Sequence, residues 1–134
     1  MVTIDVGDPA DLHPPAKRPV GARLARAMEH LAYDAPASPS GPLPAAAQRT
    51  AKGIAIRFGD VEGALTGVAA PGEFELCGPA SGSCRAVPAQ VQGRGVLLPA
   101  DPAATRIRYC WGDAPRCSLR DAALPASPFE LEVK

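Results

Sequence analysis

The sequence predicts a mainly β fold, in which an antiparallel β-sandwich accessory domain is preceded by a strand–loop–helix remnant of an α/β domain. Short runs of alternating apolar and polar residues recur from residue 45 to the C-terminus, as in a sandwich. The 16 Pro and 13 Gly cluster between apolar runs, where turns are expected. Helical periodicity is confined to residues 16–33.

A short strand is expected at residues 2–6, followed by a loop over residues 7–15. The strand prediction rests on three apolar residues that alternate with polar ones, namely Val2, Ile4 and Val6. Together with the helix that follows, this is half of an α/β unit. Such a strand needs partners for its backbone groups, and no second unit of this kind follows in the sequence.

A helix is expected over about residues 16–33, with Pro19 tolerated only because it falls in the first turn. Its apolar residues recur at helical spacing and form one stripe, made of Val20, Leu24, Met28 and Leu31. A sheet is needed to cover this stripe. If the stripe stays exposed, we expect self-association through it.

Residues 34–44, with the sequence DAPASPSGPLP, are expected to form a semi-rigid and largely solvated linker. The predicted organisation is therefore a remnant of an α/β domain at residues 1–34, a linker at 35–44 and a β-sandwich domain at 45–134.

Strands of the sandwich are expected at residues 53–58, 74–77, 86–91, 95–98 and 104–111. Aromatic residues make up only 4% of the chain, so the core is expected to rest mainly on Val, Leu, Ile and Ala. Tyr109 and Trp111 alternate on the last of these strands and should share a face. Exposed, they could stack on sugar rings, but a shared face in a sandwich favours the core. Phe129 is expected to anchor an extended C-terminal tail.

The four cysteines form two local pairs with equal spacing, Cys77/Cys84 and Cys110/Cys117. Neither pair has the spacing of a zinc ribbon or a redox motif. Two disulfides, each closing a short loop, are the favoured interpretation, and four buried free thiols are the alternative. Disulfides indicate an oxidising compartment.

Charge and hydropathy exclude several classes of partner. Lys and Arg number 14 and Asp and Glu also 14, so a neutral chain offers no electrostatic basis for binding nucleic acid or an anionic membrane. No apolar run reaches membrane-spanning length. The N-terminal residues lack the basic and apolar regions of a signal peptide.

The loop at residues 7–15 contains the chemically most informative residues. His13 lies beside Asp11 and Asp8, between a predicted strand end and a helix, which is where catalytic groups gather in α/β sheets. An imidazole oriented by a carboxylate has the parts of a general base. A surface histidine in an Asp-rich turn is the alternative, and the residues alone favour it.

Two segments of the sequence resemble sialate O-acetylesterases and related SGNH hydrolases. The first, TIDVGDPADLHPPAKRPVGARLARAMEHLAY, resembles the family's segment around the catalytic histidine. The second, RIRYCWGDAPRCSLRDAALPASPFELE, resembles its terminal segment. The resemblance implies that residues 1–34 are the C-terminal remnant of an SGNH domain, and that the protein is periplasmic or secreted.

The resemblance implies that His13 is the general base toward a serine. The acid position departs from the family's pattern, because Ala10 stands where many SGNH enzymes have an Asp three residues before the histidine. Asp11 and Asp8 are the candidates for the orienting acid, and Asp5 is expected to be structural. A Ser–His dyad held by a backbone carbonyl is the other option. No metal or other cofactor is implied.

The family's G-(D/Q)-S nucleophile box does not occur in this sequence. We therefore expect no esterase activity from this chain by itself, because a base without a nucleophile or an oxyanion hole cannot lower the acyl-transfer barrier. A truncated gene product, a start codon assigned too far downstream, or a partner chain that supplies the serine would each account for this. The implied substrates are O-acetylated sugars, chiefly O-acetylated sialic acids, with acetylxylan as a near alternative. A secreted, non-catalytic β-sandwich that binds glycan or packs against a partner is the alternative function.

Overall fold

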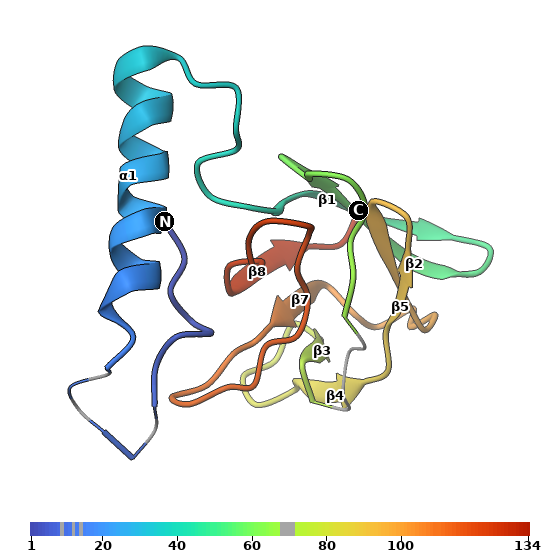
Figure 1. The fold of residues 1–134 in the computed structure, drawn as a ribbon. Coiled ribbons are helices and arrows are strands. Elements are labelled where there is room, and N and C mark those ends of the chain that lie inside the picture. The colour runs from blue at the N-terminus through green and yellow to red at the C-terminus, as the bar shows by residue number, and fades with distance from the viewer. Residues whose placement is uncertain (9, 12, 14, 68–71) are drawn as a thin grey trace.

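The computed structural model describes residues 1–8, 10–11, 13, 15–67 and 72–134, and within them it confirms the predicted mainly β fold. Two four-stranded antiparallel sheets have the strand orders β1-β2-β6-β5 and β4-β3-β7-β8 (Figure 1). The first consists of β1 (Leu43–Thr50), β2 (Gly53–Gly59), β6 (Gly95–Leu98) and β5 (Gln90–Gln92). The second consists of β4 (Arg85–Val87), β3 (Phe74–Cys77), β7 (Arg106–Tyr109) and β8 (Phe129–Glu132). Helix α1 (Lys17–Tyr33) precedes them and stands beside the sandwich.

The core lies between the two sheets and follows the alternation read from the sequence. The inward residues of four strands are buried, namely Ile54, Ile56, Phe58, Phe74, Leu76, Val96, Leu98, Ile107 and Tyr109. Aliphatic side chains make up most of this core, as expected, and aromatic rings add to it. The rings of Phe74 and Tyr109 lie 4.8 Å apart and those of Tyr109 and Phe129 lie 5.4 Å apart. Few aromatic residues suffice because they gather at one point, where each buries a large apolar area.

Two strands lie where one was expected at residues 86–91. Val87 of β4 pairs with Phe74 in one sheet, whereas Gln90 of β5 pairs with Leu97 in the other. Pro88, which has no backbone N–H to donate, lies at the point where the chain crosses between the sheets.

The predicted linker is less solvated than expected. Strand β1 begins at Leu43, ahead of the predicted domain start at residue 45. Pro42 is fully buried, and Gly41 takes a left-handed φ of 74°. At Gly41 a Cβ atom would lie 2.8 Å from the Cβ of Leu124, so close packing of the linker against the sandwich favours glycine there.

The C-terminal segment is anchored by Phe129, as predicted. Phe129 is buried and starts β8, which pairs with β7 at the edge of its sheet. Beyond β8, the Lys134 N–H donates to the carbonyl of Ala47 (3.0 Å), and the Arg49 N–H donates to the carbonyl of Lys134 (3.0 Å). These bonds connect β1 to the end of the other sheet's edge strand, so the C-terminal tail ties the two sheets together.

The prediction that Trp111 shares the core face with Tyr109 is wrong. Tyr109 is fully buried, and its hydroxyl accepts a hydrogen bond from the Leu119 N–H (3.1 Å). The next residue, Cys110, has a φ of 56°, which ends the extended backbone of β7. Trp111 is consequently turned outward and is 53% exposed.

The predicted strand at residues 2–6 is also wrong. Residues 1–3 are irregular and residues 4–6 form a turn, with the Val6 N–H donating to the Thr3 carbonyl (3.2 Å). An isolated extended segment needs a neighbouring strand for its backbone groups. None of the described strands pairs with this segment, and a local turn supplies the backbone hydrogen bond instead.

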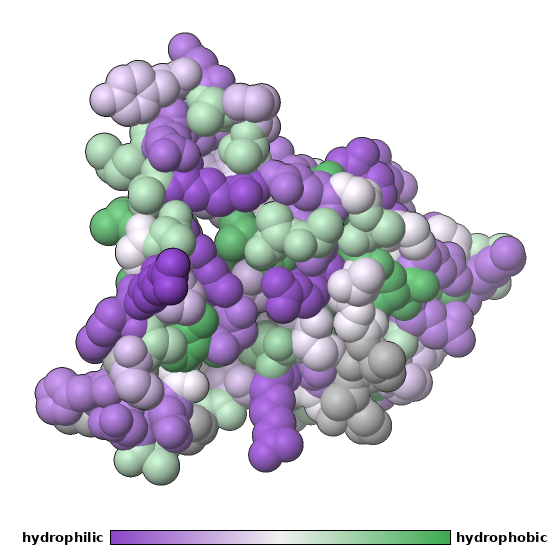
Figure 2. Space-filling view, in the orientation of Figure 1, coloured by the Kyte–Doolittle hydropathy of each residue, from purple (hydrophilic) through white to green (hydrophobic). Residues whose placement is uncertain are grey.

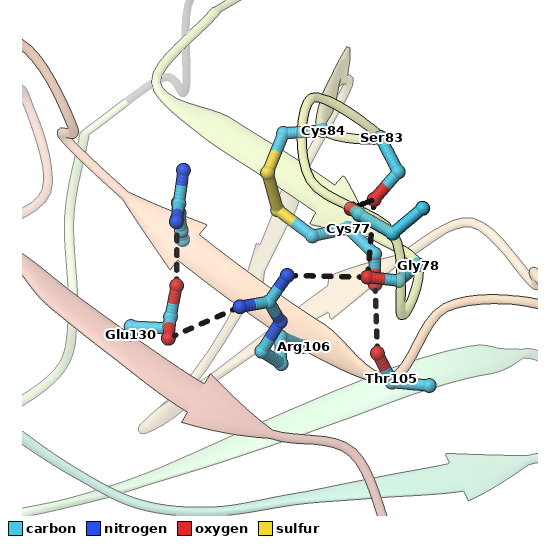
Figure 3. Close-up of a disulfide and its surroundings, with 9 residues drawn as sticks. Cys77, Gly78, Ser83, Cys84, Thr105, Arg106 and Glu130 are labelled. Carbon is cyan, nitrogen blue, oxygen red and sulfur yellow. Dashed lines mark hydrogen bonds and ion pairs between the residues drawn. A yellow bond between two sulfur atoms is a disulfide. The ribbon is translucent and has the colours of Figure 1, made fainter.

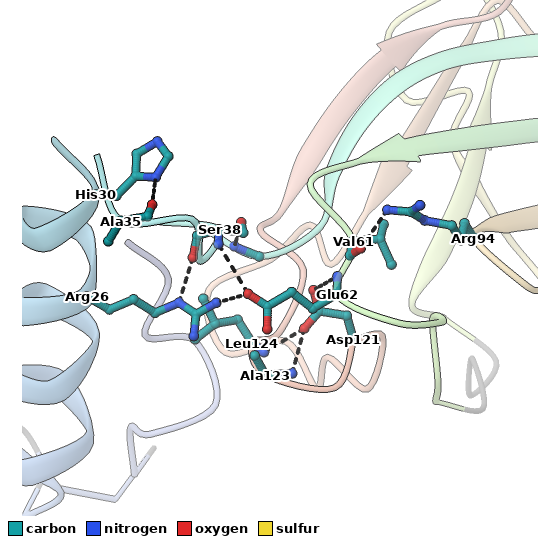
Figure 4. A network of polar contacts seen from close by, with 11 residues as sticks. Arg26, His30, Ala35, Ser38, Val61, Glu62, Arg94, Asp121, Ala123 and Leu124 are labelled. Carbon is teal, nitrogen blue, oxygen red and sulfur yellow. Dashed lines mark hydrogen bonds and ion pairs between the residues drawn. The ribbon is translucent and has the colours of Figure 1, made fainter. Parts of the chain in front are cut away.

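Helix α1 turns Arg23 and Arg26 toward the rest of the chain and most of its apolar stripe toward solvent. Arg23 bonds Asp5, while Arg26 donates to the Ser38 carbonyl (2.6 Å) and pairs with Glu62 (Figure 4). The predicted apolar stripe is largely exposed, at 52% for Leu24, 54% for Met28 and 76% for Leu31. Figure 2 shows apolar side chains along the outer edge of this helix. The described helix is too short and too polar to cross a membrane.

Both predicted disulfides are confirmed, Cys77–Cys84 and Cys110–Cys117. The first closes the loop after β3, and hydrogen bonds from two side chains hold this loop (Figure 3). The Gly78 carbonyl accepts from the Ser83 hydroxyl (3.0 Å) and from the Arg106 guanidinium (3.2 Å). The loop is therefore tied both to itself and to β7.

Replacing both Cys77 and Cys84 by Ala is expected to lower the free energy of unfolding by about 2–3 kcal/mol, because each short loop regains conformational entropy in the unfolded chain. The same loss is expected for the Cys110/Cys117 pair. Urea denaturation of the two double variants measures both. Midpoints equal to that of the unmodified protein would contradict the prediction.

Candidate functional site

The candidate site lies where the N-terminal segment meets the loop closed by the Cys110–Cys117 disulfide. In Figure 1 the loop that follows β7 extends toward the blue N-terminal segment. A cleft of about 640 Å³ between them is lined by Ile4, Asp5, Gly7 and Asp8 on one side and by residues 113–117 on the other. A second opening of about 530 Å³ adjoins it and is lined by Ile4, Trp111, Asp113, Pro115 and Pro128, among others.

Arg23 of α1 holds the N-terminal segment in place. Its guanidinium donates to both carboxylate oxygens of Asp5, with one N–O distance of 2.8 Å, and to the carbonyl of Val2 (2.9 Å). A bidentate arginine–carboxylate pair fixes orientation as well as distance. The hydrogen bond from Arg23 lowers the pKa of the Asp5 carboxyl. Asp5 therefore ties the N-terminal segment, which forms a turn and not the expected strand, to α1.

The Asp5–Arg23 pair predicts an acid-sensitive contact between the N-terminal segment and α1. Because the pKa of Asp5 is lower in the folded state, the stabilisation is complete above the unfolded value, about 3.9, and is lost as pH falls through the folded value. NMR titration of the Asp5 carboxyl should give a midpoint below 3.9, and Arg23→Gln should return it toward that value. Equal midpoints in the two proteins would contradict this.

His13 is exposed on the loop that leads to α1. Within the described part of the chain it forms one hydrogen bond, from its backbone N–H to Oδ1 of Asp11 (2.8 Å). Asp8 is used in the same way, because its Oδ1 accepts from the Ala10 N–H (2.9 Å) and its carbonyl accepts from the Asp11 N–H (3.1 Å). The two carboxylates thus shape the loop backbone.

Asp8 and Asp11 are close to His13 along the chain, but neither is hydrogen-bonded to its ring among the described residues. The imidazole is exposed to solvent, and among the described residues no side chain is hydrogen-bonded to it. Three other residues of the motif, Pro9, Leu12 and Pro14, lie outside the described residues. The arrangement offers an accessible imidazole on a loop whose backbone is set by Asx turns.

Three of the chain's serines have local structural roles. The Ser38 hydroxyl accepts from the Gly41 N–H (3.2 Å), and the Ser83 hydroxyl donates to the Gly78 carbonyl (3.0 Å). Ser118 donates through both its N–H (3.0 Å) and its hydroxyl (2.9 Å) to the buried carboxylate of Glu73. Hydroxyl groups used in this way support turns and loop packing, and none of the three is bonded to His13.

Trp111 is the residue of this region whose position sequence reasoning missed. The Arg108 guanidinium lies 4.7 Å from the centroid of the Trp111 ring, a cation–π distance, and Arg108 Nε donates to Glu130 (2.6 Å). The hydrogen bond from Arg108 lowers the pKa of Glu130. The alternation of residues 104–111 favoured the core, and only the left-handed backbone of Cys110 places the ring at the cleft.

Over nearly its whole length the chain is similar to part of an enzyme of known structure. No protein-family model and no curated protein sequence matches it. Among solved structures it matches a carbohydrate acetylesterase with 34% sequence identity and a TM-score of 0.80. That protein is XAC1771 from Xanthomonas citri, described as a novel carbohydrate acetylesterase. The match covers 96% of this chain and 31% of that one, so the chain spans about a third of the length of its structural relative.

Proposed function

We propose that this chain is the C-terminal part of a carbohydrate O-acetylesterase, carries the catalytic histidine, and has no esterase activity by itself. The observation that carries the proposal is the 34% identity over 96% of the chain to 31% of a carbohydrate acetylesterase. Because the match covers nearly the whole chain, it extends over the N-terminal third as well as the sandwich. The expected substrates are acetyl esters of sugars, with O-acetylated sialic acids as the particular class implied by the SGNH resemblance.

The orientation of α1 supports a missing partner domain. Arg23 ties one side of the helix to the N-terminal segment through Asp5, and Arg26 ties the same side to the sandwich through Glu62, so the apolar side cannot turn inward without breaking both contacts. Leu24, Met28 and Leu31 are each at least half exposed in a line along one helix face. A contiguous apolar stripe of this kind fits a surface that is covered in the complete enzyme.

In the complete enzyme, His13 would take the proton of a serine hydroxyl as that oxygen attacks the acetyl carbonyl. The acetyl group would pass to the serine, the sugar hydroxyl would leave with the proton from His13, and water would then release acetate. Asp11 would position His13 through the loop backbone, since its Oδ1 accepts the His13 N–H. The two disulfides fit a periplasmic or secreted location.

The test is the DNA upstream of Met1. An in-frame region that encodes a G-(D/Q)-S box is expected, and the extended polypeptide should hydrolyse acetylated sugars while residues 1–134 do not. A stop codon followed by a ribosome-binding site, together with no turnover after mixing with other hydrolase chains of the same genome, would overturn the proposal. Turnover by residues 1–134 that depends on His13 would refute the predicted inactivity.

A second candidate function is a secreted, non-catalytic sandwich that binds glycan. The exposed Trp111 beside an open cleft favours it, because exposed aromatic rings are common sugar-binding surfaces. A glycan-binding measurement on this chain distinguishes the two functions. A binding module would retain its glycan affinity without any serine-bearing polypeptide, whereas the esterase requires one.

The exposed face of α1 also predicts self-association of this chain. Light scattering after size exclusion should give a mass above that of the monomer, rising with protein concentration, because apolar surface is removed from water on contact. Leu24→Lys should restore the monomer. Glu29→Lys, an exposed change on the same helix, should leave the association unaltered. A wild-type monomer at every concentration would contradict the prediction.

A further inference from the structure

Trp111 is held in a fixed, outward orientation by three independent features. The left-handed backbone of Cys110 turns the chain away from the core immediately after β7. The disulfide to Cys117 closes the loop that carries the ring. The Arg108 guanidinium, itself paired with Glu130, supports the ring at 4.7 Å. A large apolar ring that is 53% exposed and held in this way is preorganised for contact.

Both apolar side chains and exposed polar side chains lie around the Trp111 ring. Ile4, Pro115 and Pro128 line the opening next to Trp111, and Asp113 borders both this opening and the neighbouring cleft. Arg116 lines the neighbouring cleft and is exposed. A carboxylate acceptor and a guanidinium donor beside an aromatic ring match a ligand with apolar C–H faces and a rim of hydroxyl groups.

We propose that Trp111, with Asp113 and Arg116 of the same disulfide-closed loop, forms a binding site for an uncharged oligosaccharide. One face of a pyranose ring would stack on the indole face that Arg108 leaves open. Its hydroxyl groups would donate to Asp113 and accept from Arg116. An uncharged sugar fits better than a polyanion, because acidic and basic groups are mixed at the site and the chain carries a net charge of 0.

The site also has a defined place relative to the catalytic loop. Ile4, Asp5 and Asp8 form the opposite wall of the cleft, and the chain runs directly from Asp8 to the loop of His13. A sugar chain bound on Trp111 would therefore extend past the segment that leads to the histidine. Sugar binding at Trp111 stands without the proposed function. Its role as a substrate subsite rests on the proposed esterase, and it holds for neutral acetylated oligosaccharides and not for sialic acids, which carry a carboxylate.

The experiment uses the fact that the sequence contains one Trp, so intrinsic indole fluorescence reports on Trp111 alone. Xylohexaose, cellohexaose and mannohexaose, all without acetyl groups, are titrated into residues 1–134. At least one is expected to give a saturable shift of the emission. Calorimetry should then show that Trp111→Ala weakens binding of that sugar at least about 10-fold, as for an aromatic hot spot, and that Asp113→Ala weakens it less.

Tyr33→Ala is the matched control, because Tyr33 is 82% exposed on α1 and lies away from the cleft. It should leave the affinity unchanged. The proposal is overturned if none of the three sugars changes the emission, or if Trp111→Ala binds as tightly as the unmodified chain. A change of emission on adding a serine-bearing hydrolase domain, with none on adding sugar, would assign Trp111 to a domain contact and also overturn it.

These outcomes are separable from those of the esterase proposal. Binding of unacetylated sugar needs neither the serine nor ester hydrolysis, so a failed search for the upstream serine box leaves the binding result standing. Conversely, the extended enzyme could be active, with no sugar bound at Trp111 and a kcat/KM that Trp111→Ala leaves unchanged. That result would support the esterase proposal and contradict the proposed subsite.

Discussion

Replacing His13 by Ala in the extended, serine-bearing polypeptide is expected to lower kcat/KM for an acetylated sugar by about 10³-fold or more, since loss of the general base removes most triad catalysis. The expected cause is chemical, because His13 is exposed and its side chain makes no described contact that folding requires. Steady-state kinetics on acetylated oligosaccharides, with circular dichroism as a check of folding, measures the effect.

His30→Ala is the matched control for this prediction. His30 is the chain's other histidine, and its ring nitrogen contacts the Ala35 carbonyl (2.8 Å) at the end of α1. The His30 variant should keep kcat/KM within a few-fold of the unmodified enzyme. If the His13 variant also stays within a few-fold, His13 is not the base.

The same assay distinguishes the two candidate acids. Asp11→Ala removes the acceptor of the His13 backbone N–H. It is expected to lower kcat and to leave KM nearly unchanged, because it misplaces the imidazole without removing it. Asp8→Ala acts one step further away, on the Ala10 N–H, and should have the smaller effect. A larger loss for Asp8 would instead indicate that Asp8 contacts the ring in the complete enzyme.

Replacing Asp121 by Ala is expected to lower the free energy of unfolding by about 3–4 kcal/mol, because buried donors that lose their acceptor cost roughly 1–3 kcal/mol each. Asp121 is 2% exposed. Its Oδ1 accepts from the N–H groups of Ala123 (2.8 Å) and Leu124 (2.7 Å), and its Oδ2 accepts from that of Glu62 (3.0 Å) (Figure 4). Urea denaturation measures the loss.

Asp121→Asn keeps the shape and one acceptor, so it should retain the bonds to Ala123 and Leu124 and lose mainly the bond from Glu62. About half of the destabilisation is expected. Asp113→Ala, which removes an exposed carboxylate, should change the stability by less than about 0.5 kcal/mol. An Asp121→Ala variant as stable as the Asp113 variant would show that water replaces the lost acceptor without cost.

This network also connects the sandwich to the helix. Glu62, whose N–H is held by Asp121, pairs through its side chain with Arg26 of α1 and accepts from the Ser38 N–H (3.1 Å). Loss of Asp121 is therefore expected to loosen α1 as well as the sandwich. The sequence contained no signal for this connection, because its members lie far apart in the chain.

Local sequence patterns were enough to predict β2, β3, β6 and β7, a helix at about residues 16–33 and both disulfides, because these depend on local periodicity and short loop closure. They did not predict β1. The accessible His13 on an Asp-shaped loop also follows from nearby residues. The strand at residues 2–6 failed because periodicity cannot supply a pairing partner, which only neighbouring backbone provides.

Only the tertiary structure decided the position of Trp111 and the direction in which α1 faces. One left-handed residue, Cys110, reverses the side on which the next ring lies, and alternation cannot anticipate that. Similarly, helical spacing identifies an apolar stripe but not what it contacts. The ion pairs of Arg23 with Asp5 and of Arg26 with Glu62 determine that this stripe faces solvent, because they hold the opposite side of the helix against the N-terminal segment and the sandwich.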